Sequence, residues 1–146
     1  MIRRQALVLL TLVGLLVATY LWLYKIGVLG HLQCGTGSCE LVQASRYAEL
    51  FGLPVALYGV GGYAALFAVG LVGLQPRFTA DRRVARVFAA LSTVGFAFTL
   101  YLTAIELFVL HAICRWCVAS AVIMTIVWLL SMFELRATPS GNTSNR

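Results

Sequence analysis

Four cysteines are the residues of this chain best suited to chemistry, and they fall into two pairs that lie far apart in the sequence. Cys114 and Cys117 form a Cys-x-x-Cys motif where a short connection turns into a long apolar run, and Cys34 and Cys39 flank the segment Gly-Thr-Gly-Ser. Two thiols three positions apart on the first turn of a helix can close a disulfide, and the helix N-terminus stabilises the thiolate form. The glycines make the first pair a pliable dithiol that can also form a disulfide. The pattern indicates a redox centre.

The composition identifies the environment of these cysteines. The chain of 146 residues is long enough for one domain. Its composition, 61 % hydrophobic and only 11 % charged residues, excludes an ordinary soluble protein. The net charge of +6 does not indicate a nucleic-acid surface, because the basic residues lie in clusters beside apolar runs. Four runs are long enough for a hydrocarbon core that needs about 20 helical residues, namely about 5–24, 55–74, 87–110 and 114–135.

We therefore predict an all-α integral membrane protein, with a bundle of four transmembrane helices over residues 1–136 and a disordered cytoplasmic tail over 137–146. The first run is longer than the core of a signal peptide and no Ala-x-Ala-like site follows it, so we expect it to remain as a span. Glycines in the second run are expected to let neighbouring helices approach closely, namely Gly59, Gly61 and Gly62.

The distribution of Lys and Arg predicts the orientation of the spans. One side of the bundle collects Arg3, Arg4, Arg77, Arg82, Arg83, Arg86, Arg136 and Arg146. The other side collects only Lys25, Arg46 and Arg115. Since basic residues mark cytoplasmic segments, both termini are expected in the cytoplasm and all four cysteines outside it, where disulfides persist.

The segment between the first cysteine pair and the second span is expected to fold as a short helix. Residues 40–51 can form an amphipathic helix that lies across the outer mouth of the bundle, either as a cap over its interior or as an ordinary interfacial helix. Gly52-Leu53-Pro54 ends this helix and starts the second span, because proline is tolerated in a first helical turn.

Two ionisable residues near the second cysteine pair are candidates for a proton relay. Glu106 lies in the third span, on a helical face with Leu102, Thr103 and Leu110, and acids inside a membrane are costly and often functional. It could instead reach the interface and pair with Arg115 or a headgroup. His111 precedes the motif by three residues and could take a thiol proton, although a loop histidine often has no chemical role.

Three functions compete for the cysteines. A four-thiolate zinc site fits the spacing formally, but the oxidising side and the lack of carboxylates near the second pair disfavour it, so no metal is expected. Structural disulfides in a four-span scaffold or transport protein are a second possibility, but such short loop closures stabilise little. Electron transfer through thiol–disulfide exchange accounts for both pairs, the glycines and the membrane, and we prefer it.

The sequence resembles the vitamin K epoxide reductase family in the form of its bacterial homologues. The features that carry the resemblance are the Cys34 and Cys39 pair, Ser45-Arg46-Tyr47, Phe51-Gly52-Leu53-Pro54, Glu106-Leu107-Phe108 and Cys114-Arg115-Trp116-Cys117. The resemblance covers nearly the whole chain. It implies a four-helix bundle with a short capping helix, located in the bacterial inner membrane, that encloses a quinone, either menaquinone or ubiquinone, near the outer face.

The resemblance also implies an electron path. Cys34 would exchange with a thioredoxin-like partner, Cys39 would pass electrons to Cys114, and Cys117 would adjoin the quinone. Ser45 would correspond to the serine that supports the active-site loop. Because the chain stops soon after the fourth span, the partner is expected to be a separate protein.

The sequence departs from the family pattern around the quinone. The asparagine and tyrosine with which the animal enzymes contact the quinone or its epoxide fall on Val55 and Ala121. Simple quinone reduction is therefore expected rather than epoxide reduction. Further residues expected to line the pocket from their positions are Tyr47, Tyr58, Leu102 and Leu110.

Overall fold

The fold is a bundle of membrane-spanning helices. The computed structural model describes residues 2–28, 49–78, 81–111 and 115–137. Within them lie the helices α1 (Ile2–Lys25), α3 (Val55–Leu74), α4 (Arg82–Ala104) with its π-helical continuation η2 (Ile105–Leu110), and α5 (Arg115–Ala137). These make four spans that are long and apolar enough to cross a membrane, so the predicted four-helix membrane bundle is confirmed.

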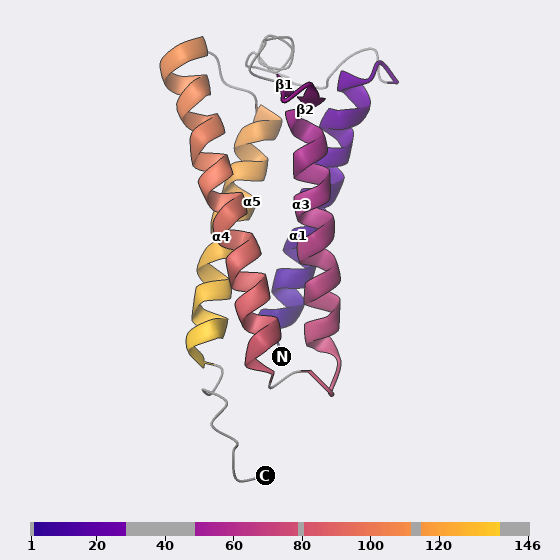
Figure 1. The fold of residues 1–146 in the computed structure, drawn as a ribbon, viewed down its shortest axis with the longest axis vertical. Coiled ribbons are helices and arrows are strands. Elements are labelled where there is room, and N and C mark those ends of the chain that lie inside the picture. Colours follow the sequence, from indigo (N-terminus) through magenta and orange to yellow (C-terminus); the bar gives the residue numbers. More distant parts are fainter. Residues whose placement is uncertain (1, 29–48, 79–80, 112–114, 138–146) are drawn as a thin grey trace.

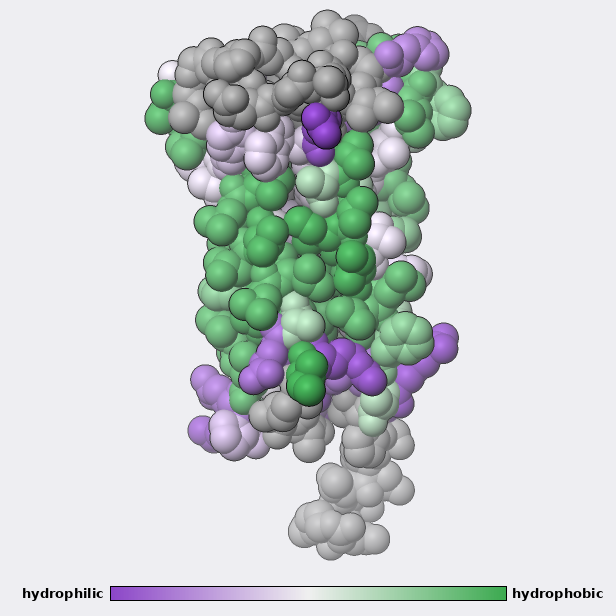
Figure 2. Space-filling model, turned by 180° about the vertical axis from the view of Figure 1, so that it is seen from behind, coloured by the Kyte–Doolittle hydropathy of each residue, from purple (hydrophilic) through white to green (hydrophobic). Residues whose placement is uncertain are grey.

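The four helices form a closed ring in which each contacts two neighbours. Helix α1 packs against α3 and α5, and α4 packs against the same two helices from the other side. Figure 1 shows them side by side, with the start of α1 and the end of α5 at the same end of the bundle. We call that end the terminal end and the opposite one the hairpin end. In Figure 2 a hydrophobic band separates hydrophilic residues at the two ends, as expected of a membrane protein.

Side chains of the terminal half are tightly packed and linked between helices. Leu66 and Val127 are almost inaccessible, at 1 % and 0 % exposure. The Ser92 hydroxyl lies 2.8 Å from that of Ser131, which joins α4 to α5. The Arg4 guanidinium contacts the Glu134 carboxylate at 3.0 Å and donates to the carbonyl of Gly73 at 2.9 Å, so it joins α1 to both α5 and α3.

A small hairpin stands at the opposite end, before α3. Strand β1 (Glu49–Leu50) pairs antiparallel with β2 (Leu53–Pro54), and both residues of the turn, Phe51 and Gly52, have positive φ, at 54° and 80°. Two left-handed residues in succession are the geometry of a two-residue hairpin turn with the twist of the strands. The prediction of a helix over 40–51 is therefore wrong for its last three residues. The rest of that predicted helix, residues 40–48, lies outside the described residues.

The sequence missed the hairpin for a physical reason. A non-glycine side chain at positive φ is strained, so Phe51 gave no turn signal before the glycine. Pro54 also differs slightly from expectation, since it is the cap that precedes α3 rather than a residue of its first turn. An ion pair of 3.6 Å between Lys25 and Glu49 connects the hairpin to the last turn of α1.

The third span changes its winding near the hairpin end. The sequence predicted one continuous α-helix to residue 110, whereas the last six residues, η2, form a π-helix. It ends at His111, whose φ of 52° is left-handed and whose backbone N–H donates to the carbonyl of Glu106. Short π-helical segments within α-helices often occur at functional sites.

Candidate functional site

A cavity of about 140 Å³ lies inside the bundle in its hairpin half. An engineered apolar cavity of about 150 Å³ in another protein holds benzene, so this volume matches one aromatic ring. All four spans contribute to its walls. Every predicted pocket residue within the described part of the chain lines it, namely Val55, Tyr58, Leu102, Leu110 and Ala121.

Cys117 also lines this cavity, and it belongs to the first turn of α5. It packs with the buried residues Val17 and Leu21 of α1. The neighbouring Trp116 fixes this turn, because its ring lies 4.8 Å from that of Tyr20. A sulfur in a first helical turn benefits from the helix dipole when it becomes a thiolate. The other predicted catalytic residues and one predicted pocket residue lie outside the described residues, namely Cys34, Cys39, Cys114, Ser45 and Tyr47.

The two proton-relay candidates have different environments. Glu106, in η2, is only 7 % exposed and lines the cavity, together with Leu102, Thr103 and Leu110 as the sequence predicted. A carboxyl group at such a site is costly to bury and is expected to have a function. His111 is exposed beyond the end of η2 and is not among the described residues of the cavity wall. The structure therefore places Glu106, and not His111, at the cavity.

The polar residues of the cavity wall that were not predicted from the sequence include Tyr63 and Ser120, which contact each other. The Tyr63 hydroxyl of α3 lies 2.9 Å from the Ser120 carbonyl oxygen and 3.0 Å from the Ser120 hydroxyl of α5. Ser120 follows Cys117 by three positions, so both lie on one face of α5, and this spacing could have identified it. Tyr63 gave no such signal, because a tyrosine among small apolar residues is equally typical of packing.

The glycines of α3 serve two purposes. A Cβ on Gly59 would lie 3.3 Å from the Cβ of Ala18, so α1 and α3 approach closely there, as predicted. Gly61 and Gly62 do not make such an approach, because a Cβ on either would have no neighbour within 4 Å. Gly62 instead lines the cavity. The prediction of close packing at these two glycines is therefore wrong, and the missing side chain of Gly62 leaves the cavity larger.

The cavity wall has the properties of a quinone site. Most of the wall is apolar, which suits an aromatic ring, and the polar groups of Tyr63, Glu106 and Ser120 can meet polar atoms on a ring. Cys117 supplies a thiol in the same wall. Both a lipid-soluble ring and the group that would exchange electrons with it can thus occupy one cavity.

A comparison with known families agrees with this chemistry. The model of the vitamin K epoxide reductase family matches residues 5–132, a stretch that covers the second and third spans completely, most of the first and fourth, and the whole described cavity wall. Members of this family are membrane oxidoreductases that use quinones as electron acceptors. The chain belongs to the vitamin K epoxide reductase family and is a membrane thiol–quinone oxidoreductase.

Proposed function

We propose that the protein reoxidises a separate thioredoxin-like partner outside the cytoplasm and so supports disulfide formation in exported proteins. Electrons pass through the Cys34/Cys39 pair and then the Cys114/Cys117 pair to a membrane quinone. The observation that carries this proposal is the position of Cys117 in the wall of a ring-sized cavity inside the bundle. A scaffold or transport protein has no need of a cysteine at such a site.

The relay consists of thiolate attacks on disulfides. A partner dithiol reduces the Cys34–Cys39 disulfide and becomes a disulfide itself. The Cys39 thiolate then attacks the sulfur of Cys114 in the Cys114–Cys117 disulfide, which releases Cys117 as a thiolate. Cys34 next attacks Cys39 in this mixed disulfide, which restores the Cys34–Cys39 bond and leaves Cys114 and Cys117 reduced. Each rate depends on thiolate fraction, access and leaving-group pKa.

Residues of the cavity wall support the last electron transfer of the relay, to the quinone. The first turn of α5 favours the thiolate of Cys117, which lies in a mostly apolar wall. A quinone, when bound, supplies an acceptor for two electrons and two protons. Glu106 is the cavity residue that can hold a proton on a carboxyl oxygen and release it inside the membrane.

The proposed ring contacts follow from the cavity wall. Tyr58, Leu102 and Leu110 would contact the ring, and Val55 and Ala121 would add apolar wall where the animal enzymes have polar groups. These two substitutions favour quinone reduction over epoxide reduction. Menaquinone and ubiquinone both present a flat ring of the required kind, and the roles of Ser45 and Tyr47 remain predictions from the resemblance.

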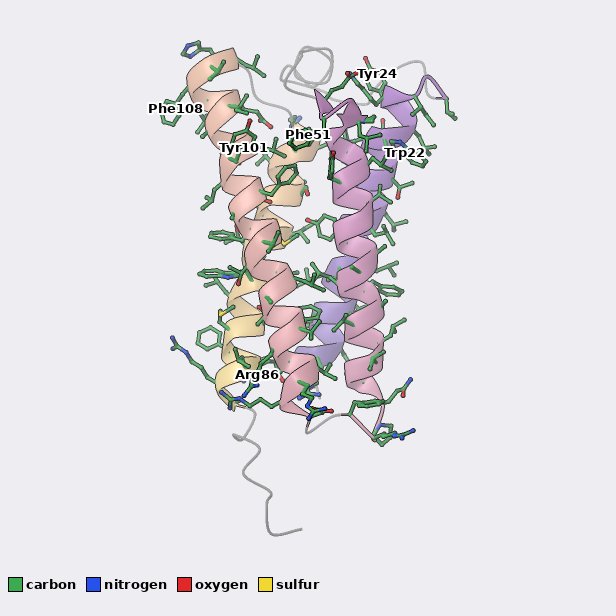
Figure 3. The ribbon with its side chains drawn as sticks, viewed as in Figure 1. Trp22, Tyr24, Phe51, Arg86, Tyr101 and Phe108 are labelled. Carbon is green, nitrogen blue, oxygen red and sulfur yellow. The ribbon has the colours of Figure 1, made fainter. Side chains whose placement is uncertain are left out.

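We propose, as the resemblance implies, that the protein lies in the inner membrane of a bacterium. The charge distribution supports an orientation with both termini in the cytoplasm. Arg82, Arg83 and Arg86 open α4 at the terminal end, and Arg3 and Arg4 open α1 there. In Figure 3 the side chain of Arg86 lies at this end, while Trp22 and Tyr24 lie at the hairpin end, as is typical of interfacial aromatic residues. The hairpin end would then face the oxidising side.

An anaerobic assay tests the relay. Purified protein is mixed with a short-chain quinone and a reduced thioredoxin-like protein or a small dithiol, and quinone absorbance is followed for wild type and four single Cys→Ser variants. We expect Cys114→Ser and Cys117→Ser to abolish quinone reduction with both donors. Cys34→Ser should fail with the protein donor and still work with the small dithiol. Equal rates in all five proteins, or no quinone consumption with any thiol, would overturn the proposal in favour of a scaffold.

A further inference from the structure

Two hydroxyl groups meet in the wall of the cavity, one turn from Cys117. Tyr63 of α3 is 2 % exposed, and its oxygen lies within hydrogen-bond distance of both the carbonyl and the hydroxyl of Ser120. Both residues line the cavity. We call them the cavity hydroxyl pair. It is a polar contact between α3 and α5 in a wall that is otherwise mostly apolar.

The hydrogen atoms of this pair can be arranged in two ways. In the first, Tyr63 donates to the Ser120 carbonyl and the Ser120 hydroxyl donates to Tyr63, so that both hydrogens are used internally. In the second, Tyr63 donates to the Ser120 hydroxyl, which leaves the hydrogen of Ser120 for another acceptor. Because either hydroxyl can be the donor at the observed 3.0 Å, the change moves no heavy atom.

Ser120 differs from other hydroxyl residues of the bundle. Thr125, Ser92 and Ser131 each donate to a carbonyl three or four positions earlier in their own helix, at 2.7–2.9 Å. Within the described residues, Ser120 shows hydrogen bonds to Tyr63 alone. Its hydroxyl is therefore directed across the helix interface and is not consumed by its own helix.

The position of Tyr63 is fixed from the opposite side by α1. A Cβ on Gly14 would overlap the ring of Tyr63, so the glycine is what allows this ring to lie where it does. Tyr63 belongs to the buried core, lines the cavity, and contacts Ser120 through its hydroxyl. This arrangement holds the cavity hydroxyl pair rigidly, as a binding group requires.

We propose that the cavity hydroxyl pair donates a hydrogen bond to one ring carbonyl oxygen of the bound quinone. The inference rests on the proposed function and specifies how the ring is recognised. Val55 and Ala121 give the cavity no hydrogen-bonding side chain at those positions, so polar recognition falls to other residues. A hydroxyl in the turn that follows Cys117 fixes the ring through its oxygen and thereby positions it beside the sulfur.

The test uses Tyr63→Phe, Ser120→Ala and the double variant, with two matched controls. Tyr101→Phe removes a tyrosine hydroxyl of α4 that is half exposed (Figure 3), and Ser131→Ala removes a serine hydroxyl of α5 that pairs with Ser92. Neither control residue lines the cavity within the described part of the chain. Steady-state rates give KM and kcat for a short-chain quinone. Infrared difference spectra of carbonyl-labelled quinone report its hydrogen bond directly.

We expect the double variant to raise the KM for quinone about threefold to tenfold with a smaller change in kcat. The carbonyl band of the bound quinone should move to higher frequency, since a lost hydrogen bond strengthens the C=O bond. Each single variant should give a part of this shift, because one hydroxyl remains, and both controls should behave as wild type.

Two outcomes separate this inference from the proposed function. If wild type reduces quinone and Cys117→Ser does not, but the double variant keeps the wild-type KM and carbonyl band, the cavity hydroxyl pair is only structural and the inference is wrong. If wild type itself reduces no quinone with any thiol donor, the proposed function fails first.

Discussion

The two halves of the bundle are built from the same four helices but differ in how completely they are filled. The hairpin half contains the cavity of about 140 Å³, whereas a cavity in the terminal half has only about 40 Å³. The terminal half also contains Thr11, Ser92 and Ser131, which are polar and almost completely buried, each with a hydrogen bond. The hairpin half leaves Gly62 facing open space.

This difference shows how a small membrane protein can maintain a cavity. Lipid gives helices no hydrophobic reason to associate, so packing and polar contacts between helices must hold them together. In the terminal half the contacts of Arg4 with Glu134 and Gly73, and that between Ser92 and Ser131, supply these links. These contacts hold the helices together in the terminal half, and in the hairpin half the helices can lie further apart around the cavity. We therefore expect substitutions in the terminal half to change mainly the free energy of unfolding, and substitutions in the hairpin half to change mainly quinone reduction.

The largest effect is expected at Cys117, in the hairpin half. Cys117→Ser removes the thiol of the cavity wall, so quinone reduction should be lost completely, while the free energy of unfolding should change by no more than about 0.5 kcal/mol because the two side chains are similar in size. Quinone absorbance and thermal unfolding in detergent measure the two quantities. Residual turnover near the wild-type rate would show that Cys117 is not in the electron path.

The next largest effect is expected at the opposite end. Glu134→Ala leaves Arg4 without its carboxylate, and the side chains of both residues are only 16 % exposed. Loss of one partner of a buried ion pair costs about 3–5 kcal/mol, and we expect about 3 kcal/mol because some exposure remains. The KM for quinone of the folded fraction should stay at the wild-type value.

A matched control separates this ion pair from an ordinary surface charge. Arg3 also contacts Glu134, at 3.4 Å, but its side chain is 44 % exposed. Arg3→Ala should therefore change the unfolding free energy by less than about 1 kcal/mol. Equal losses for Arg3→Ala and Glu134→Ala in thermal unfolding would show that burial does not decide the effect.

The spans could be predicted from the sequence because an apolar run of the right length has one stable arrangement in a membrane. Helix α3 (55–74) has the predicted bounds, and the other spans extend a few residues beyond them. Six residues of the cavity wall were expected there, Tyr58, Leu102 and Leu110 from their positions, and Cys117, Val55 and Ala121 from the resemblance to the family. The hairpin turn at Phe51 and the π-helix η2 were not, because both depend on local backbone geometry that tertiary contacts impose.

Glycines of α1 and α3 give a further comparison, now within one pair of helices. Gly14→Ala places a methyl group where the Tyr63 ring lies, whereas Gly62→Ala places one in open space. Overpacking costs about 1–3 kcal/mol, so Gly14→Ala should destabilise the protein by about 2 kcal/mol. Gly62→Ala should stabilise it by about 0.5 kcal/mol, because alanine restricts the unfolded chain.

Thermal unfolding of the two alanine variants checks the predicted loss of stability for Gly14→Ala and the predicted gain for Gly62→Ala. Quinone kinetics provide a second measurement. Gly14→Ala should also raise the KM for quinone, since it moves the ring of Tyr63. A stabilised Gly14→Ala variant would mean that Tyr63 can shift freely, and then the cavity hydroxyl pair could not be rigidly held.

A small loss of stability is expected when either of the two serines of α5 that form hydroxyl pairs is replaced by alanine. Hydrogen bonds between membrane helices contribute about 0.6 kcal/mol on average, so Ser131→Ala and Ser120→Ala should lower the unfolding free energy by about this amount each. Because the two changes are alike in stability, a difference in quinone KM between them can be assigned to the cavity. If Ser131→Ala raised the KM as much as Ser120→Ala, the two halves would be coupled, and the terminal half would do more than hold the helices together.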